Sequence, residues 1–491
     1  MEPKPCSIRI PRYLIEVDHA SGPRVVLHRS LPEQASYVAL SYVWGTNQTY
    51  VLTKKTLQEK CSGLDHAQVP KTISDAMNVT KQLGYSFLWV DALCIVQDDR
   101  ENMADEISSM GKIYRDSEVT IIAANAPSST DGFLGVSESP YYFVEPFDVP
   151  LQTESKIEQL LSVGYRSYYK PFKDPINSRA WTLQERILST RCLVYSYDGL
   201  KWICRTCEKN PSAPWDAPSM FPRMALPNNL AVPAGTDTNG GIRQTWLDIR
   251  AEYTRRNLTN DEDKLPAISA IAFEIAKLTG WSYLVGLWKE HLFTDLQWRC
   301  DRHTTTPTPG EDSLSNPLRP RPPKYRAPSW SWASIDGPIV DADESYGFRE
   351  NFHFRIVSCD IEYRSAARTG DFPFEPVKSG TLVVEGRIIG TDWQWSDPSD
   401  LADAQLIYQE QGTTYICGDI TFDASEPTLN SGTKLFCLAM SVLKSNRTRW
   451  PIEGLLLLPE NEPETYRRVG LFETYSTTIF DGVRERLSTI I

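Results

Sequence analysis

The segment FLWVDALCIVQDD, residues 87–99, constrains the fold of this chain more than any other. Its first four residues form an apolar run that is too short for a helix and rich in aromatic and branched side chains, so it predicts a strand buried on both faces. Asp91 follows directly, at the strand end where open α/β sheets place their ligand crevice. Asp91 can line such a cleft or accept backbone N–H groups in the turn, and the sequence leaves both roles open. One of Asp98 and Asp99 is expected to cap the helix that follows.

The segments around this strand predict further strands and helices in alternation. They are strands at 35–43 and 119–124, helices at 72–84 and from about residue 100, and a helix running into a strand at 178–197. This alternation is typical of an α/β fold, a parallel sheet with helices on its faces. Because parallel strands point the same way, Trp44, Gly45, Asp91 and Asn125 are expected to meet at one end of the sheet.

The rest of the chain predicts a helical region and then a β-rich module. Residues 209–241 are rich in Pro, Gly and Asn, which predicts a long loop or linker. Helices are expected after it, the last of them at 281–296. Beyond residue 341, apolar runs alternate with turn residues, as in antiparallel strands. The expected domains are 1–208 with a core at 35–191, the linker 209–241, the helical region 242–340 and the β-rich C-terminal module 341–491.

The block PSWSWAS at 328–334 carries aromatic side chains at alternating positions. In an extended segment, Trp330 and Trp332 would share one face. We expect that face to pack the helical region against the first domain.

Composition and charge exclude several classes of function. The net charge is −12, with both signs spread along the chain, which argues against nucleic acid as a partner. The longest apolar runs, at 119–126 and 454–459, are far shorter than the about 20 residues of a membrane-spanning helix. The N-terminal residues carry no signal-peptide core. We therefore expect a soluble, cytoplasmic protein with no membrane span.

The cysteines and histidines predict no metal centre. The ten cysteines are irregularly spaced, which is typical of reduced thiols. Cys204 and Cys207 form a C-x-x-C pair without a second ligand pair nearby, so structural thiols are expected there rather than zinc. The six histidines show no paired ligand spacing.

Several blocks of the sequence resemble the fungal heterokaryon-incompatibility (HET) domain. They are SYVWG at 41–45, LGYSFLWVDALCIVQDD at 83–99, MGKIYRDSEVTIIAANA at 110–126 and RAWTLQERILSTR at 179–191. Three later blocks are similar to the region that commonly follows this domain: DEDKLPAISAIA at 261–272, YLVGLWKEHLFTDLQW at 283–298 and RAPSWSWASIDG at 326–337. The resemblance covers most of residues 35–340.

The resemblance implies a fold and a chemistry. HET domains are regarded as distant relatives of the TIR fold, whose enzymes use a glutamate in the sheet-end cleft to cleave the nicotinamide–ribose bond of NAD. NAD would then be a substrate, and no cofactor is expected. The motif WTLQER points to Glu185 as that glutamate, although Glu185 beside Arg186 also fits a structural ion pair. The resemblance equally implies self-association, or binding of a protein partner, that signals cell death.

Cleavage of an N-glycosidic bond builds positive charge on the ribose, which a nearby carboxylate stabilises. The candidate catalytic residues are Glu185 and Asp91, which must then be neighbours. Flat aromatic side chains hold flat bases, and small residues let backbone N–H groups approach a phosphate. The candidate substrate-binding residues are Ser41, Trp44, Gly45, Cys94, Gln97, Trp181 and Gln184.

Other functions stay open beside this one. The chain has no G-x-G-x-x-G and no P-loop sequence, so neither standard nucleotide fingerprint supports NAD binding. A recognition and signalling module without enzymatic activity is the main alternative, because the β-rich module carries no chemical motif. A tailoring role in a fungal secondary-metabolite pathway is a weaker one.

Overall fold

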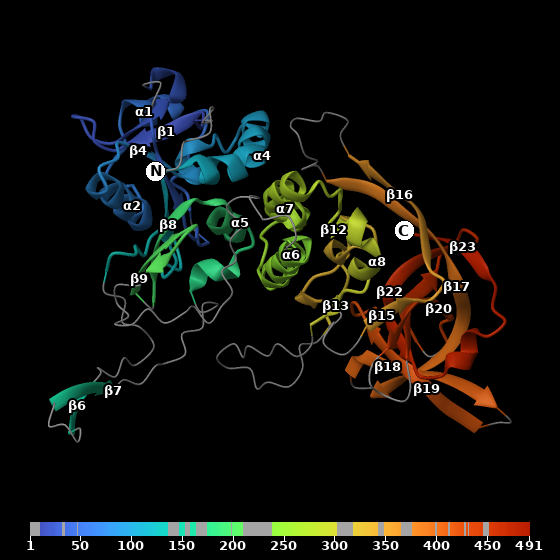
Figure 1. The fold of residues 1–491 in the computed structure, drawn as a ribbon. Helices are drawn as coiled ribbons and strands as arrows, with labels where there is room; N and C mark the ends of the chain where they lie inside the picture. Colours follow the sequence, from blue (N-terminus) through green and yellow to red (C-terminus); the bar gives the residue numbers. More distant parts are fainter. Residues whose placement is uncertain are drawn as a thin grey trace. The chain divides into compact units, whose positions relative to one another are not determined.

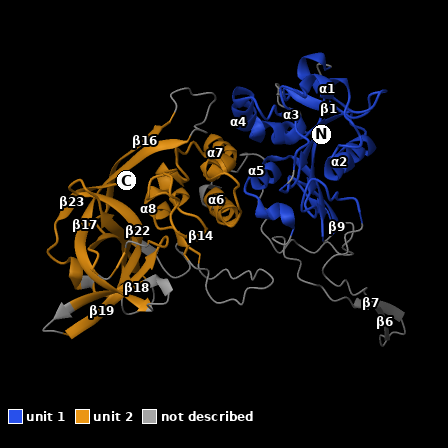
Figure 2. Cartoon of the chain, turned by 180° about the vertical axis from the view of Figure 1, so that it is seen from behind, with its two compact units in different colours: residues 1–228 blue, residues 229–491 orange. Residues whose placement is uncertain are grey.

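The computed structural model divides the chain into two compact units, residues 1–228 and 229–491 (Figure 2). The structure describes residues 10–31, 35–46, 48–135, 147–152, 158–163, 174–197, 199–209, 238–301, 318–341, 348–364, 376–397, 400–410, 413–426, 429–430, 432–444 and 451–491. The division falls inside the expected linker 209–241, most of which lies outside the described residues. No helix in the described ranges is long and apolar enough to cross a membrane.

In its described part, the first unit contains an eight-stranded sheet in the order β10-β9-β8-β5-β3-β4-β1-β2. Its strands are β1 (Tyr13–Glu16), β2 (Arg24–Leu27), β3 (Val38–Ser41), β4 (Phe87–Trp89), β5 (Val119–Ala123), β8 (Arg191–Ser196), β9 (Gly199–Cys204) and β10 (Glu208–Lys209). The central strands β4, β3, β5 and β8 are parallel, as expected. The outer strands are antiparallel, so the sheet is mixed. A separate hairpin consists of β6 (Phe147–Gln152) and β7 (Glu158–Val163).

Helices cover both faces of this sheet, with α2 on one side and α4 on the other (Figure 1). The helical elements are η1 (His28–Ser30), α1 (Leu57–Ser62), α2 (Lys71–Gln82), α3 (Asp91–Cys94), α4 (Arg100–Asp116), η3 (Pro175–Ser178) and α5 (Trp181–Leu188). The α4 helix is fixed to β3, because the Tyr114 hydroxyl donates to the Leu40 carbonyl at 3.1 Å. At its start, the Asp99 side chain accepts the Asn102 N–H, which confirms the expected cap.

The core of the first unit is built around β4. Leu88, Trp89 and Val90 are fully buried, and Phe87 is half-buried against the same core. Burial of a side chain such as Leu contributes about 1.5–3 kcal/mol relative to exposure. The strand predicted from 87–90 is therefore central to the stability of the unit.

The second unit begins with two long helices and a series of short elements. They are α6 (Thr238–Thr254), η4 (Asp261–Lys264), α7 (Pro266–Thr279), β11 (Tyr283–Leu284), β12 (Leu287–Trp288), η5 (Lys289–His291), α8 (Leu292–Asp295), β13 (Arg299–Cys300), η6 (Trp332–Ser334) and β14 (Ile339–Val340). The helix expected at 281–296 is not continuous, because the β11–β12 hairpin takes up 283–288 and only the short helices η5 and α8 follow it. Its turn needs Gly286, where φ is +99° and an added Cβ would lie 2.5 Å from Nε1 of Trp332.

The β-rich region follows as a nine-stranded sheet in the described residues. Its elements are β15 (Phe348–Asn351), β16 (Arg355–Tyr363), β17 (Val377–Asp397), β18 (Asp400–Glu410), β19 (Thr413–Phe422), β20 (Leu435–Lys444), β21 (Ile452–Pro459), β22 (Thr465–Thr474), η8 (Thr477–Phe480) and β23 (Glu485–Ile490). Pairing runs from β17 through β18, β19, β22, β21 and β20 and back to β17, so these strands form a closed ring. Closure leaves these strands without a free edge.

A buried arginine joins this ring to the helical part of the second unit. The Arg468 guanidinium pairs with Asp423 at 2.8 Å, donates to the Leu296 and Trp298 carbonyls, and lies 3.6 Å from the ring centroid of Trp298. The Arg468 N–H donates to Ser329 Oγ in the PSWSWAS block. Breaking a buried ion pair by removing one partner costs about 3–5 kcal/mol.

The PSWSWAS block differs from the extended conformation expected for it. Trp330 and Trp332 are both fully buried, but residues 332–334 form a 3-10 helix rather than an extended segment. The indole N–H of Trp332 donates to the Gly286 carbonyl at 2.8 Å, and the Ser331 hydroxyl donates to the Val285 carbonyl at 2.6 Å. The block therefore packs inside the second unit, where it covers the β11–β12 turn.

Candidate functional site

The ends of β3 and β4 place Trp44 beside Asp91. The indole N–H of Trp44 donates to Oδ2 of Asp91 at 2.7 Å, and Oδ1 accepts the Ala92 N–H at 2.7 Å. Asp91 therefore accepts a backbone N–H in its turn and also faces a side chain from the neighbouring strand. The expected meeting of Trp44 and Asp91 at one end of the sheet is confirmed.

The α5 helix brings Glu185 to the same end of the sheet. Burial raises the pKa of Glu185 to about 7; the Ser41 hydroxyl, Arg179 and Tyr114 oppose this shift, whereas the charge of Asp91 adds to it. The side chain is buried, with 6 % of its surface exposed. Two carboxyl groups almost 100 residues apart in sequence thus act on each other electrostatically.

Arg179 is the cation of this cluster. It precedes α5, its Nη1 donates to the Tyr42 carbonyl at 2.8 Å, and its charge favours the ionised forms of both Asp91 and Glu185. Arg179, rather than the adjacent Arg186, is thus the principal cation beside Glu185. The sequence motif had suggested Arg186, because neighbours along the chain are visible in a sequence and neighbours across a turn are not.

Burial also raises the pKa of Asp91, against the effects of Arg179, the Trp44 indole, the Ala92 N–H and the Tyr42 hydroxyl. Burial and the nearby Asp91 carboxylate raise the pKa of Tyr42. A pKa that burial raises and that specific neighbours adjust is common among catalytic carboxyl groups.

We call Ser41, Tyr42, Trp44, Asp91, Tyr114, Arg179 and Glu185 the carboxylate cluster. Its buried members are Ser41, Tyr42, Tyr114 and Glu185, and its half-buried members are Trp44, Asp91 and Arg179. Tyr42, Tyr114 and Arg179 were missed from the sequence, although they lie inside the SYVWG, MGKIYRDSEVTIIAANA and RAWTLQERILSTR blocks.

The other candidate residues lie in different surroundings. Cys94 is fully buried, its Sγ accepts the Val90 N–H, and burial raises the pKa of its thiol, so it is a core residue without access to a ligand. Gln97 donates to the carbonyls of Asp91 and Ile95, each at 3.1 Å, and thereby holds the loop after β4. Burial therefore argues against ligand contact by Cys94, whereas ligand contact by Gln97 stays a prediction.

Three more candidate substrate-binding residues are Gly45, Trp181 and Gln184. Gly45 is exposed, with φ +75°, and an added Cβ would lie 2.6 Å from Cβ of Ser128, so the turn itself requires glycine. Trp181 begins α5 and is half-buried against the core of the first unit. Gln184 is buried, and its Oε1 has no hydrogen-bond donor among the described residues.

Asn125 follows β5 at the same end of the sheet. Its N–H donates to the Tyr195 carbonyl at 3.0 Å, which ties the end of β5 to β8. Its Oδ1 is buried without a donor in the described part of the chain. A buried acceptor of this kind can be satisfied by a ligand.

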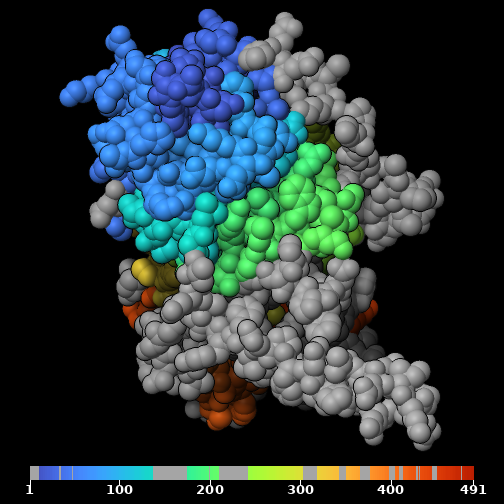
Figure 3. Space-filling model, turned by 90° about the vertical axis from the view of Figure 1, so that its left-hand side faces the viewer, coloured from blue at the N-terminus to red at the C-terminus, as the bar shows by residue number. Residues whose placement is uncertain are grey.

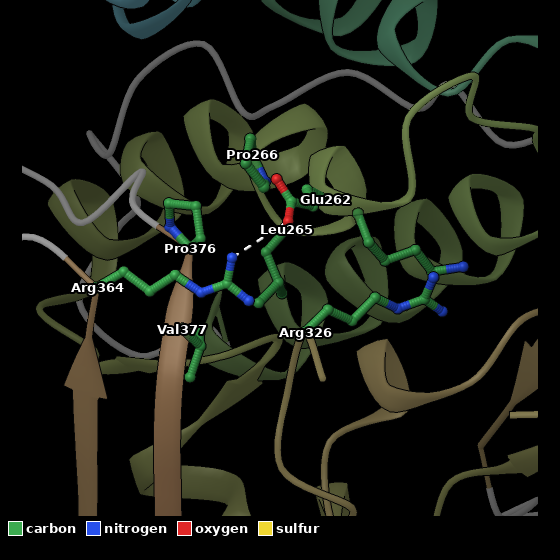
Figure 4. A pocket seen from close by; sticks show the side chains of 8 residues that line it. Glu262, Leu265, Pro266, Arg326, Arg364, Pro376 and Val377 are labelled. Atoms are coloured by element: carbon green, nitrogen blue, oxygen red, sulfur yellow. Dashed lines mark hydrogen bonds and ion pairs between the residues drawn. The ribbon is translucent and has the colours of Figure 1, made fainter. Parts of the chain in front are cut away.

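A pocket in the second unit is too small for a nucleotide (Figure 4). Its lining residues are Glu262, Lys264, Leu265, Pro266, Arg326, Arg364, Pro376 and Val377. Its cavity volume is about 10 Å³, room for about one water molecule. Nη1 of Arg364 donates a hydrogen bond across the pocket to Oε1 of Glu262 at 3.1 Å. The described residues also contain no group of three or more His, Cys, Asp or Glu that could hold a metal ion.

Comparison with known families identifies one match. Residues 37–185 match the family model described as "Heterokaryon incompatibility protein (HET)". The matched range begins just before β3 and ends at Glu185, so it contains the whole carboxylate cluster. Searches of curated proteins and of solved structures gave no match.

Proposed function

We propose that this chain, which is a heterokaryon-incompatibility (HET) domain protein, serves self and non-self recognition in a fungus and triggers cell death by cleaving the nicotinamide–ribose bond of NAD. The proposal includes a TIR-like origin for the first unit. The parallel order β4-β3-β5-β8 supports that origin, because it is a doubly wound arrangement with its crevice at the carboxyl ends of β3 and β5.

The observation that carries the proposal is the pairing of Glu185 with Asp91 at this end of the sheet. In the reaction, the bond between ribose C1′ and the nicotinamide nitrogen breaks, its electron pair stays with nicotinamide, and water adds to C1′. A carboxylate stabilises the positive charge that develops on the ribose. With a pKa of about 7, Glu185 can also accept the proton of the attacking water near neutral pH.

The other cluster members would have positioning roles. Arg179 favours the ionised form of both carboxyl groups, and the indole N–H of Trp44 fixes the orientation of Asp91. Trp44 is half-buried against the core of the first unit, so only the exposed part of its ring could stack on a flat base. Because Glu185 is buried, a ribose can reach it only when the side chains that cover it move.

The test is nicotinamide release from NAD by the purified full chain. Glu185→Gln keeps the size of the side chain and removes the carboxylate, so we expect a loss of about 100-fold or more. The matched control is Glu59→Gln, an exposed carboxylate on α1, which should retain the wild-type rate. Absence of nicotinamide release by the wild type, even at high concentration under crowding that drives assembly, would contradict the proposal.

A recognition module without enzymatic activity is the second candidate, and exposed apolar side chains near the end of the β18–β19 hairpin favour it. The rings of Tyr408 and Tyr415 stack with their centroids 5.1 Å apart, and Ile416 is 58 % exposed. Tyr475, whose N–H donates to the Cys417 carbonyl, is also exposed. Exposed aromatic clusters of this kind are common at protein interfaces. If this candidate is right, Glu185→Gln will leave cell killing intact, whereas Ile416→Lys will change the choice of partner.

A further inference from the structure

Cys204 and Cys207 face each other across the β9–β10 turn. Cys204 is the last residue of β9, Cys207 directly precedes β10, and the Cys204 N–H donates to the Cys207 carbonyl at 2.9 Å. This bond closes the turn and brings the two Sγ atoms to 3.4 Å from each other. The pair is therefore preorganised by the hairpin.

Polar groups surround the sulfur of Cys204. The Cys207 N–H donates to this sulfur at 3.4 Å, and the Thr206 hydroxyl lies 3.3 Å from it. Burial raises the pKa of Cys204, but the Thr206 hydroxyl and the N–H groups of Thr206 and Cys207 together outweigh it and lower the pKa to about 6. Such a thiol is mainly thiolate at neutral pH.

The turn is also accessible. Both cysteines are half-exposed, and β10 is the outermost strand of the sheet. The green surface of the segment that includes β8 and β9 faces solvent in Figure 3. Other cysteines differ: Cys192 is buried with a pKa raised to about 12, and burial raises the pKa of the half-exposed Cys61. The expected structural role is thus a poor fit to this pair.

We propose that Cys204 and Cys207 form a thiol–disulfide exchange site that reacts with small-molecule or protein disulfides. This inference is independent of the proposed nucleotide chemistry. The Cys204 thiolate attacks one sulfur of the partner disulfide, forms a mixed disulfide and releases the other sulfur as a thiolate. Cys207 then loses its proton to solvent and attacks Sγ of Cys204, which forms the internal disulfide and releases the second thiolate. The partner disulfide is reduced by two electrons and the cysteine pair is oxidised by two.

Metal binding explains the pair less well. A structural zinc ion requires four ligands, and the described residues supply no third His, Cys, Asp or Glu beside the two sulfurs. An exchange site needs only the two thiols that are present.

The test uses glutathione disulfide on the reduced full chain, followed by trypsin under non-reducing conditions. Arg205 lies between the two cysteines, so trypsin separates Trp202–Arg205 from Thr206–Lys209 unless a disulfide joins them. We expect the linked pair of fragments in the wild type, formed at least about 10-fold faster than glutathione adds to Cys61, because thiolate fraction sets the rate.

Two variants assign the roles. Cys207→Ser removes the resolving thiol, so glutathione should remain attached to Cys204, whereas Cys204→Ser should leave Cys207 largely unmodified over the same time. Both substitutions lie at a half-exposed turn, and an unchanged circular dichroism spectrum will verify folding. Absence of the linked fragments in the wild type would overturn the proposal, as would equal modification rates at Cys204 and Cys61.

Discussion

Glu185 makes the stability of the first unit depend on pH. Its pKa in the folded chain is about 7, above the usual value of about 4.3 in an unfolded chain, so the folded state binds more protons between these values. The stabilisation by the neutral form is full below the unfolded pKa and is lost as pH rises through the folded pKa. Each pKa unit corresponds to about 1.4 kcal/mol, so the shift from about 4.3 to about 7 gives an upper limit of about 4 kcal/mol.

Glu185→Gln should remove this dependence. We expect the variant and the wild type to have similar free energies of unfolding at about pH 5. At about pH 8 the free energy of unfolding of the variant should exceed that of the wild type by about 1–3 kcal/mol. Urea denaturation across this range measures the difference. If instead the free energy of unfolding of the variant falls relative to the wild type as pH rises, the Glu185 carboxylate is stabilised by its neighbours more than it is destabilised by burial.

At the scale of the element, the turn after β3 depends on Gly45. Gly45→Ala meets two costs: a left-handed backbone, about 1 kcal/mol for a residue with a Cβ, and a contact of 2.6 Å with Cβ of Ser128. Gly84 has φ +81° and open space around it, so Gly84→Ala carries the first cost alone. We expect Gly45→Ala to lower the free energy of unfolding by at least about 1 kcal/mol more than Gly84→Ala, as measured in urea. Equal losses of unfolding free energy in the two variants would show that Ser128 moves to make room for the added Cβ.

The elements differ in how far the sequence predicts them, and the reason is the range of the forces involved. The strand at β4 and the helices α2 and α4 were predicted because their apolar spacing is local. The β11–β12 hairpin was missed, since its apolar residues also fit a helix and its turn is fixed by Trp332, which is distant in sequence. Likewise, Glu185 and Asp91 were singled out as carboxylates within motifs. Tyr114 and Arg179 lie in the quoted motifs too, but only tertiary packing brings them to the two carboxyl groups.

At the scale of the whole molecule, the two compact units should respond separately to mutation. Arg468→Met removes the closer ion-pair partner of the buried Asp423 and leaves it, among the described residues, only Arg321, whose Nη2 lies 3.9 Å from Oδ2, so we expect the second unit to lose about 3 kcal/mol. Hydrogen exchange should then accelerate in β17–β22 and remain unchanged in β3–β5. The control is Arg355→Met on the same sheet, because the Arg355–Glu385 pair is exposed and contributes under about 1 kcal/mol. Faster exchange in β3–β5 after Arg468→Met would show that the units unfold together.

The closed ring of strands has a consequence for synthesis of the chain. The ring is complete only when β22 pairs with both β19 and β21, and β17 pairs with β23 across about a hundred intervening residues. During translation the strands of the second unit therefore keep unpaired edges until β23 has left the ribosome. Among the described residues, the sheet of the first unit contains no strand later than β10, so this sheet can fold before the second unit has been synthesised.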